Sequence, residues 1–263
     1  MKVIFIRHGE PDYINDSLTD NGKKEAEYVA KRVAKWDVTD FYVSPQGRAQ
    51  ATAAPTLKLL NREALTLPFM REFSYKIKDP VSGKIGVPWD FVPSSWTSCD
   101  SNFQIGDGFL EYPCIKDNPE IEEKYYDAIN SFDELLKKYG YIRDGRIYRN
   151  QKPFNRRLKS TVSPENKVRN NSPYKEGEKE PTIVIFCHLG ITCLIMSHLL
   201  NIPFETLTHG FYMPPTSVTV LTTEERWDDE VSFRCQMVGD TRHLYENGQE
   251  VSPAGLFAAP FQG

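Results

Sequence analysis

The chain has 263 residues, a formal net charge of −4 and a hydrophobic fraction of 40%. This length can bury a full hydrophobic core, and the weakly negative charge gives no basic field for nucleic acid. The opening segment, MKVIFIRHGE, holds too short an apolar run for a signal sequence or a membrane span, so we expect no membrane association. Five cysteines without paired spacing favour free thiols and a cytoplasmic location.

The first predicted strand spans residues 2–6 and leads into Arg7 and His8. Its β-branched and aromatic residues are typical of a buried strand, and open α/β sheets bind ligands in loops at the carboxyl ends of their strands. Thr19 then caps a predicted amphipathic helix, whose apolar positions recur at helical spacing as far as Val33.

A second short strand is predicted at residues 41–44, followed by a helix that opens around Gly47 and Arg48. Free backbone N–H groups and the helix dipole both favour an anion at a helix N-terminus. Arg48 is therefore a candidate ligand for a phosphate group.

Regular periodicity fades between residues 75 and 112, where prolines and glycines interrupt an aromatic-rich run typical of an ordered loop or cap. A long helix is predicted at residues 118–139. The polar stretch at 143–179 is rich in Lys and Arg and predicts a solvated excursion, with a second phosphate contact or a protein partner as the alternative. We expect one domain, 1–263, with residues 75–180 as a large insertion.

A continuous apolar strand is predicted at residues 182–187, followed by His188 and an apolar helix that reaches Leu200. This order of strand, histidine and helix repeats the layout around the first motif. Residues 217–222 and 231–238 then predict a pair of antiparallel strands.

The candidate site combines two histidines and two arginines that all belong to the same edge of the predicted sheet. Arginine binds phosphoryl oxygens with a planar fork and keeps its charge at neutral pH, and a neutral imidazole can act as a nucleophile. Together, Arg7, His8, Arg48 and His188 predict phosphoryl-transfer chemistry, whereas either histidine alone is more often structural. Because the motifs supply arginines instead of a carboxylate-rich set, we expect neither a metal ion nor a cofactor.

These residues resemble the signatures of the histidine phosphatase superfamily, which includes the cofactor-dependent phosphoglycerate mutases. Residues 7–9, Arg-His-Gly, are similar to the RHG signature of this superfamily. Four further similarities follow in chain order, at Leu18-Thr19 with Gly22, at Ser44-Pro45 with Arg48, Thr52 and Ala53, at Cys187-His188, and at the sequence GDTRHL of residues 239–244.

The resemblance implies a three-layer α/β/α sandwich with a mostly parallel central sheet, as in phosphoglycerate mutases, and with the insertion as a cap. It also implies a role for each of the four site residues. His8 is expected to be the phosphorylated nucleophile, while Arg7, Arg48 and His188 are expected to bind the phosphoryl oxygens.

Glu72 matches the position at which many members of the superfamily hold the acid that protonates the leaving oxygen. The glycine and Trp-x-Gly that usually follow this acid are replaced here by residues 75–80 and a long loop. Asp107 and Glu111, both in the insertion, are therefore alternative acids, because a general acid is defined by its reach to the leaving oxygen.

We thus expect a metal-independent phosphomonoesterase of the histidine acid phosphatase type that hydrolyses a small phosphorylated substrate. In this mechanism His8 attacks phosphorus, an acid protonates the departing alcohol, and water cleaves the phosphohistidine. A phosphoglycerate-mutase-type phosphotransferase is the first alternative. A non-catalytic module that binds a phospho-ligand or a partner is the second. The sequence does not predict the particular phosphomonoester or the oligomeric state.

Overall fold

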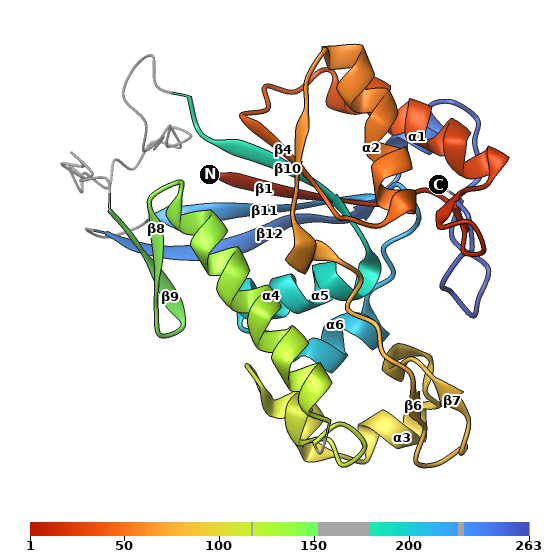
Figure 1. The fold of residues 1–263 in the computed structure, drawn as a ribbon, viewed down its shortest axis with the longest axis vertical. Helices are drawn as coiled ribbons and strands as arrows, with labels where there is room; N and C mark the ends of the chain where they lie inside the picture. Colours follow the sequence, from red (N-terminus) through yellow and green to blue (C-terminus); the bar gives the residue numbers. More distant parts are fainter. Residues whose placement is uncertain (117, 152–178, 226–228, 263) are drawn as a thin grey trace, which may run out of the picture.

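A computed structural model describes residues 1–116, 118–151, 179–225 and 229–262. In this part of the chain, an eight-stranded sheet is flanked by helices on both faces (Figure 1). In spatial order its strands are β5 (Ala64–Thr66), β4 (Asp40–Val43), β10 (Thr182–Cys187), β1 (Lys2–Arg7), β11 (Val218–Glu225), β12 (Glu230–Asp240), β9 (Ile147–Asn150) and β8 (Tyr141–Asp144). The expected α/β sandwich is confirmed, but its sheet is mixed instead of mostly parallel: among the described strands, three of the seven neighbouring pairs are parallel and four are antiparallel.

The half of the sheet that carries the candidate site is parallel. β1 pairs in parallel with β10, so that Arg7 lies opposite Cys187, and β10 pairs in parallel with β4. The residues that directly follow these three strands are His8, His188 and Ser44. Parallel register therefore brings all three to one edge. The other half is antiparallel, from β11 onwards, as predicted for the pair β11 and β12.

Both faces of the sheet are covered by helices. On one face lie α1 (Asp20–Val33) and α2 (Gly47–Leu60); on the other lie α4 (Pro119–Lys137), α5 (Leu189–Leu200) and α6 (Phe204–Gly210) (Figure 1). Along β1, Ile4 and Ile6 join the core beneath α1 and α2, whereas Val3 and Phe5 join the larger core on the opposite face. Burial on both faces explains why this strand is a continuous apolar run.

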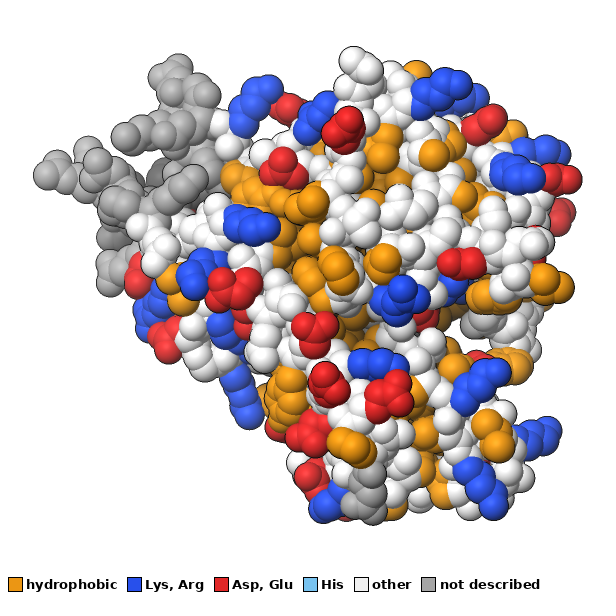
Figure 2. Space-filling view, in the orientation of Figure 1, with side chains coloured by type: hydrophobic (Ala, Val, Ile, Leu, Met, Phe, Trp, Pro, Cys, Tyr) orange, Lys and Arg blue, Asp and Glu red, His pale blue; other side chains and the backbone are white. Residues whose placement is uncertain are grey.

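The helix starts follow the expected capping chemistry. The Thr19 side chain accepts a hydrogen bond from the Gly22 N–H at the start of α1, and the Asn118 side chain caps α4. No helix in the described residues is long and apolar enough to cross a membrane. Figure 2 shows acidic and basic side chains interspersed over the visible face.

The polar stretch at residues 143–179 is predicted to be a solvated excursion, and this prediction is wrong for residues 143–150. β8 and β9 form an antiparallel hairpin that extends the sheet next to β12. Tyr141 and Tyr148 are 1% exposed, and Tyr148 packs edge to face on Phe233 with ring centroids 5.3 Å apart. The burial of these rings outweighs the charge of the residues around them. The remainder of the stretch, 152–178, lies outside the described residues.

The insertion after Glu72 is built from short elements and turns, as its composition predicts. It contains β6 (Ile77–Lys78), β7 (Ile85–Gly86), α3 (Pro93–Thr97), and the short 3₁₀ helices η2 (Pro88–Asp90), η3 (Asp100–Phe103) and η4 (Gly108–Glu111). The insertion packs against α6 through buried aromatic rings: the ring centroids of Phe109 and Phe204 are 4.8 Å apart. The remaining short elements are β2 (Pro11–Asp12), β3 (Ser17–Leu18), η1 (Pro68–Met70) and α7 (Arg242–Tyr245).

Candidate active site

His8 lies at the end of β1 and is 1% exposed. Its backbone N–H donates to the Cys187 carbonyl at 2.9 Å, and its Nδ1 lies 2.8 Å from the Gly9 carbonyl oxygen. Since a carbonyl can only accept, Nδ1 carries the proton and Nε2 keeps its lone pair. Burial, followed by the charge of Arg7, lowers the pKa of His8 well below its usual value. The ring is therefore a neutral imidazole with a free Nε2.

His188 lies beside this ring, at the N-cap of α5, with the two ring centroids 5.1 Å apart. Its Nε2 is 2.7 Å from Ser44 Oγ, which accepts a hydrogen bond from the Gln46 N–H at 3.3 Å. Ser44 Oγ can accept that hydrogen bond and donate its own proton to Nε2, and in this arrangement the ring proton of His188 lies on Nδ1. Desolvation is the largest cause that lowers the pKa of His188, followed by His8. His188 is thus a neutral donor.

Arg7 and Arg48 are each held by the fold through their terminal nitrogens. Arg7 donates to the carbonyls of Met213 at 2.8 Å and Ala254 at 3.0 Å. Arg48, the second residue of α2, pairs with Asp16 at 2.7 Å. These contacts fix both guanidinium groups while leaving their Nε atoms available.

Three buried donors in the site have no hydrogen-bond partner among the described residues. They are Arg7 Nε, Arg48 Nε and His188 Nδ1. Buried polar groups are nearly always satisfied in folded proteins, so these atoms indicate a missing acceptor. A phosphoryl group supplies several anionic oxygens and forms charge-assisted hydrogen bonds with arginine. The arrangement is suited to binding a phosphoryl group in front of His8.

Glu72 also reaches this edge of the sheet. Its Oε1 accepts a hydrogen bond from the Ile191 N–H at 3.1 Å, in the first turn of α5, which begins next to His188. Desolvation raises the pKa of Glu72, opposed by that backbone hydrogen bond and by the nearby charges of Arg48 and Arg7. A raised pKa keeps a carboxylic acid protonated at higher pH, as a general acid requires.

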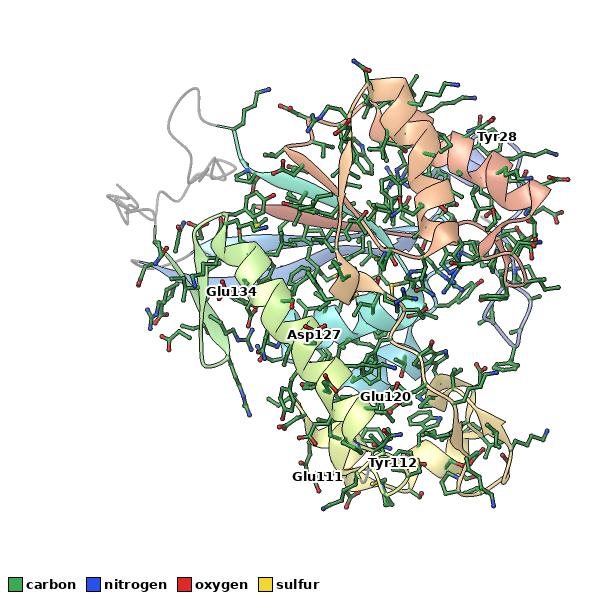
Figure 3. The ribbon with its side chains drawn as sticks, in the orientation of Figure 1. Tyr28, Glu111, Tyr112, Glu120, Asp127 and Glu134 are labelled. Carbon is green, nitrogen blue, oxygen red and sulfur yellow. The ribbon has the colours of Figure 1, made fainter. Side chains whose placement is uncertain are left out.

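The two alternative acids lie elsewhere. Glu111 is exposed and pairs with Lys116, at the end of the insertion farthest from the sheet (Figure 3). Asp107 accepts a hydrogen bond from the Tyr126 hydroxyl at 3.0 Å. The structure thus brings Glu72, and neither of these residues, towards the two histidines.

Sequence reasoning missed several residues that shape the site. Ser44 lies within the stretch similar to a superfamily motif, and that similarity could have marked it as a partner for a site residue. Asp16 has no such signal, because only folding brings its loop to Arg48. Trp89 comes from the insertion: a Cβ atom at Gly190 would lie 3.0 Å from its ring. The insertion therefore borders the site.

Replacing Ser44 with alanine is expected to weaken the binding of inorganic phosphate. The substitution removes the donor that holds the His188 proton on Nδ1, and losing one hydrogen bond to an anion weakens affinity about 10-fold. Isothermal titration of phosphate into both proteins measures the difference. Ser131→Ala, which removes an exposed hydroxyl bonded to Asp127 on α4, serves as the control. Equal affinities for Ser44→Ala and the unmodified protein would contradict the assigned tautomer.

Glu25 on α1 accepts a hydrogen bond at 2.7 Å from the Glu10 N–H, in the nucleophile loop (residues 8–10) that follows β1. Desolvation raises the pKa of this buried carboxyl to about 7. An acid whose pKa is raised on folding disfavours the folded state once it ionises, so stability is lost as pH rises from about 4.5 to about 7. A shift of this size corresponds to at most about 3 kcal/mol. Urea unfolding at pH 5 and pH 8 should show a smaller pH dependence for Glu25→Gln than for the unmodified protein; an equal dependence would contradict this assignment.

Comparison with known proteins gives one family model that matches part of the chain. Residues 3–79, which contain Arg7, His8, Arg48 and Glu72, match the model of the histidine phosphatase superfamily (branch 1). The predicted resemblance is confirmed. The match to the histidine phosphatase superfamily supports phosphatase activity. No curated protein sequence matches the chain significantly.

Several solved structures share the fold of this chain over most of their own length. A phosphoserine phosphatase from Entamoeba histolytica, solved with phosphoserine, is 18% identical with a TM-score of 0.54; the match covers 92% of this chain and 98% of that one. A mycobacterial glucosyl-3-phosphoglycerate phosphatase is 14% identical with a TM-score of 0.54, covering 90% and 98%. At these identities the likeness shows the fold.

Proposed function

We propose that this chain is a metal-independent phosphomonoesterase of the histidine acid phosphatase type that acts through a phosphohistidine on His8. One observation carries the proposal. A neutral imidazole with a free Nε2 lies beside three buried donors, on Arg7, Arg48 and His188, that have no acceptor among the described residues. This is the donor set that a phosphoryl group in position for attack would satisfy.

In the first displacement, His8 Nε2 forms a bond to phosphorus as the bond from phosphorus to the ester oxygen breaks. The negative charge on the phosphoryl oxygens is stabilised by the two arginines and by His188 Nδ1–H. Glu72 gives its proton to the departing oxygen, which leaves as an alcohol.

In the second displacement, water attacks the phosphohistidine and the bond from Nε2 to phosphorus breaks. The Glu72 carboxylate, now ionised, accepts a proton from that water and is reset for the next turnover. Phosphate leaves, and His8 returns to the neutral state that its buried position favours.

The positive charge of the site supports a mechanism without a metal ion. Arg7 and Arg48 already supply fixed cations, and a divalent ion beside them would be repelled. The free thiols of all five cysteines support a cytoplasmic location. We further propose that the chain is a single domain in which the first part of the 75–180 insertion forms a cap, because Trp89 borders the site, whereas α4 and the β8–β9 hairpin pack with the central sheet.

The decisive experiment is phosphate release from a panel of phosphomonoesters in excess EDTA. The panel includes phosphoserine, the phosphoglycerates and an aryl phosphate, because the similar structures belong to phosphatases of phosphoserine and of glucosyl-3-phosphoglycerate. We expect release without added metal, with one substrate preferred. Activity that EDTA abolishes and a divalent ion restores would overturn the metal-free mechanism. Interconversion of phosphoglycerates faster than phosphate release would indicate a mutase, and binding without turnover a non-catalytic module.

A further inference from the structure

Thr216, just before β11, is buried and has a φ of 55°. A β-branched residue rarely adopts this left-handed conformation, and such outliers cluster where the fold enforces a functional geometry. The backbone N–H of Thr216 lies 3.1 Å from the Arg7 carbonyl oxygen and 3.2 Å from that of His8. One donor thus holds the backbone of both the nucleophile and a phosphate ligand.

The side chain of Thr216 is held in turn by His243. The hydroxyl donates to the Pro215 carbonyl at 2.8 Å and lies 3.1 Å from His243 Nε2. His243 Nδ1 lies 3.3 Å from the Arg32 guanidinium. Because arginine can only donate, Nδ1 is the acceptor and Nε2 carries the proton. The hydrogen bonds therefore run in one direction, from Arg32 through His243 to Thr216.

The far end of this chain of contacts is anchored by Asp240, at the end of β12, which pairs with Arg32 at 2.6 Å. His243 is 1% exposed, and burial followed by the charge of Arg32 lowers its pKa to about 3. His243 therefore stays neutral, in one tautomer, across the ordinary range of pH. Asp240 and His243 both lie in the GDTRHL stretch, to which the proposed mechanism gives no task.

We propose that His243 is a positioning residue that fixes the nucleophile loop: it donates to Thr216, whose backbone N–H holds the carbonyls of Arg7 and His8. This inference rests on the proposed function of His8. The direction in which His8 Nε2 points is set by its backbone, and a displacement of about 1 Å at a reacting atom can cost about 100-fold in rate. His243 acts through Thr216 and needs no contact with the substrate.

The test compares two substitutions of His243. The amide nitrogen of glutamine can take the place of Nε2 and still donate to Thr216, whereas leucine cannot. We expect His243→Leu to lower kcat for an aryl phosphate by about 100-fold with little change in KM, and His243→Gln to stay within about 5-fold of the unmodified enzyme. His198→Gln is the matched control, since His198 is a mostly buried histidine bonded to Asp133 at 2.9 Å between α4 and α5.

A double-mutant cycle with Thr216→Val separates positioning from general destabilisation. Valine keeps the shape of threonine and its backbone N–H but removes the hydroxyl that His243 contacts. If both residues act as one unit, the variant that combines Thr216→Val with His243→Leu loses no more activity than the worse single variant. Should His243→Leu fail to fold, Thr216→Val alone carries the test, with the same expected loss in kcat.

A second measurement does not depend on turnover. The ¹⁵N signals of the His8 ring report its tautomer and surroundings, and we expect His243→Leu to shift them while His243→Gln and His198→Gln leave them in place. The inference is overturned if His243→Leu keeps both kcat and these signals, if His198→Gln lowers kcat equally, or if the losses in the cycle multiply. If His8 itself proves dispensable for turnover, the proposed function fails, while the His8 signals still decide the positioning role.

Discussion

Replacing His8 with alanine is expected to abolish phosphate release from every substrate of the panel. In the proposed mechanism the buried imidazole of His8 attacks phosphorus, and losing a covalent nucleophile costs on the order of 10⁵-fold or more in kcat. His8 is buried and neutral, so its replacement by alanine removes the nucleophile without leaving a charged group unpaired. Steady-state assays of phosphate release in EDTA measure the loss directly.

The covalent step is checked separately by trapping the intermediate. Acid-labile, base-stable labelling from a ³²P-phosphomonoester should appear on the unmodified protein and be absent from His8→Ala. His198→Ala is the control, because it removes a histidine that contacts Asp133 from the last turn of α5, at the opposite end of this helix from His188. Labelling that survives in His8→Ala would place the nucleophile elsewhere and reject the mechanism.

Glu72→Gln is expected to have the second largest effect, and one that depends on the leaving group. A departing alkoxide needs a proton and an aryl oxide does not, so the loss in kcat should be about 10²- to 10⁴-fold for alkyl phosphates and small for 4-nitrophenyl phosphate. The rate of the unmodified enzyme with alkyl substrates should fall as pH rises through the raised pKa of Glu72, because the acid form disappears. The rate of Glu72→Gln with alkyl substrates should not show this fall at high pH.

Glu111→Gln provides the matched control for that experiment. Glu111 is exposed and paired with Lys116, and it is the acid that the sequence left as an alternative. Unchanged rates for Glu111→Gln are expected with both classes of substrate. An equal loss for alkyl and aryl phosphates in Glu72→Gln would indicate a role in substrate binding instead of proton transfer.

Strand ends, helix starts and the insertion all lie at one edge of the sheet, where the site is formed. The β1 and β10 strands end side by side, α2 and α5 begin at the same edge, and the insertion contributes Trp89 next to Gly190. The helix starts add favourable dipoles for an anion. Glu72 and Gln46 help to line a cavity of about 320 Å³.

The sequence by itself determined the parts whose signals are local. Continuous apolar runs that end in histidines predict buried parallel strands, and Thr19 and Arg48 mark helix starts that the structure contains. Five motifs in order were enough to indicate the superfamily. Parallel register then brings His8 and His188 together, because neighbouring strands end at the same edge.

Only the tertiary structure decided the rest, because those contacts join residues that are distant in the chain and carry no periodic signal. It separated Glu72 from Asp107 and Glu111, paired Arg48 with Asp16, and turned residues 141–150 into a sheet hairpin. It also brought His243 into contact with Thr216, which precedes it by 27 residues and whose backbone N–H holds the carbonyl of His8. A motif names the residue types that the chemistry needs, whereas packing fixes each proton and lone pair.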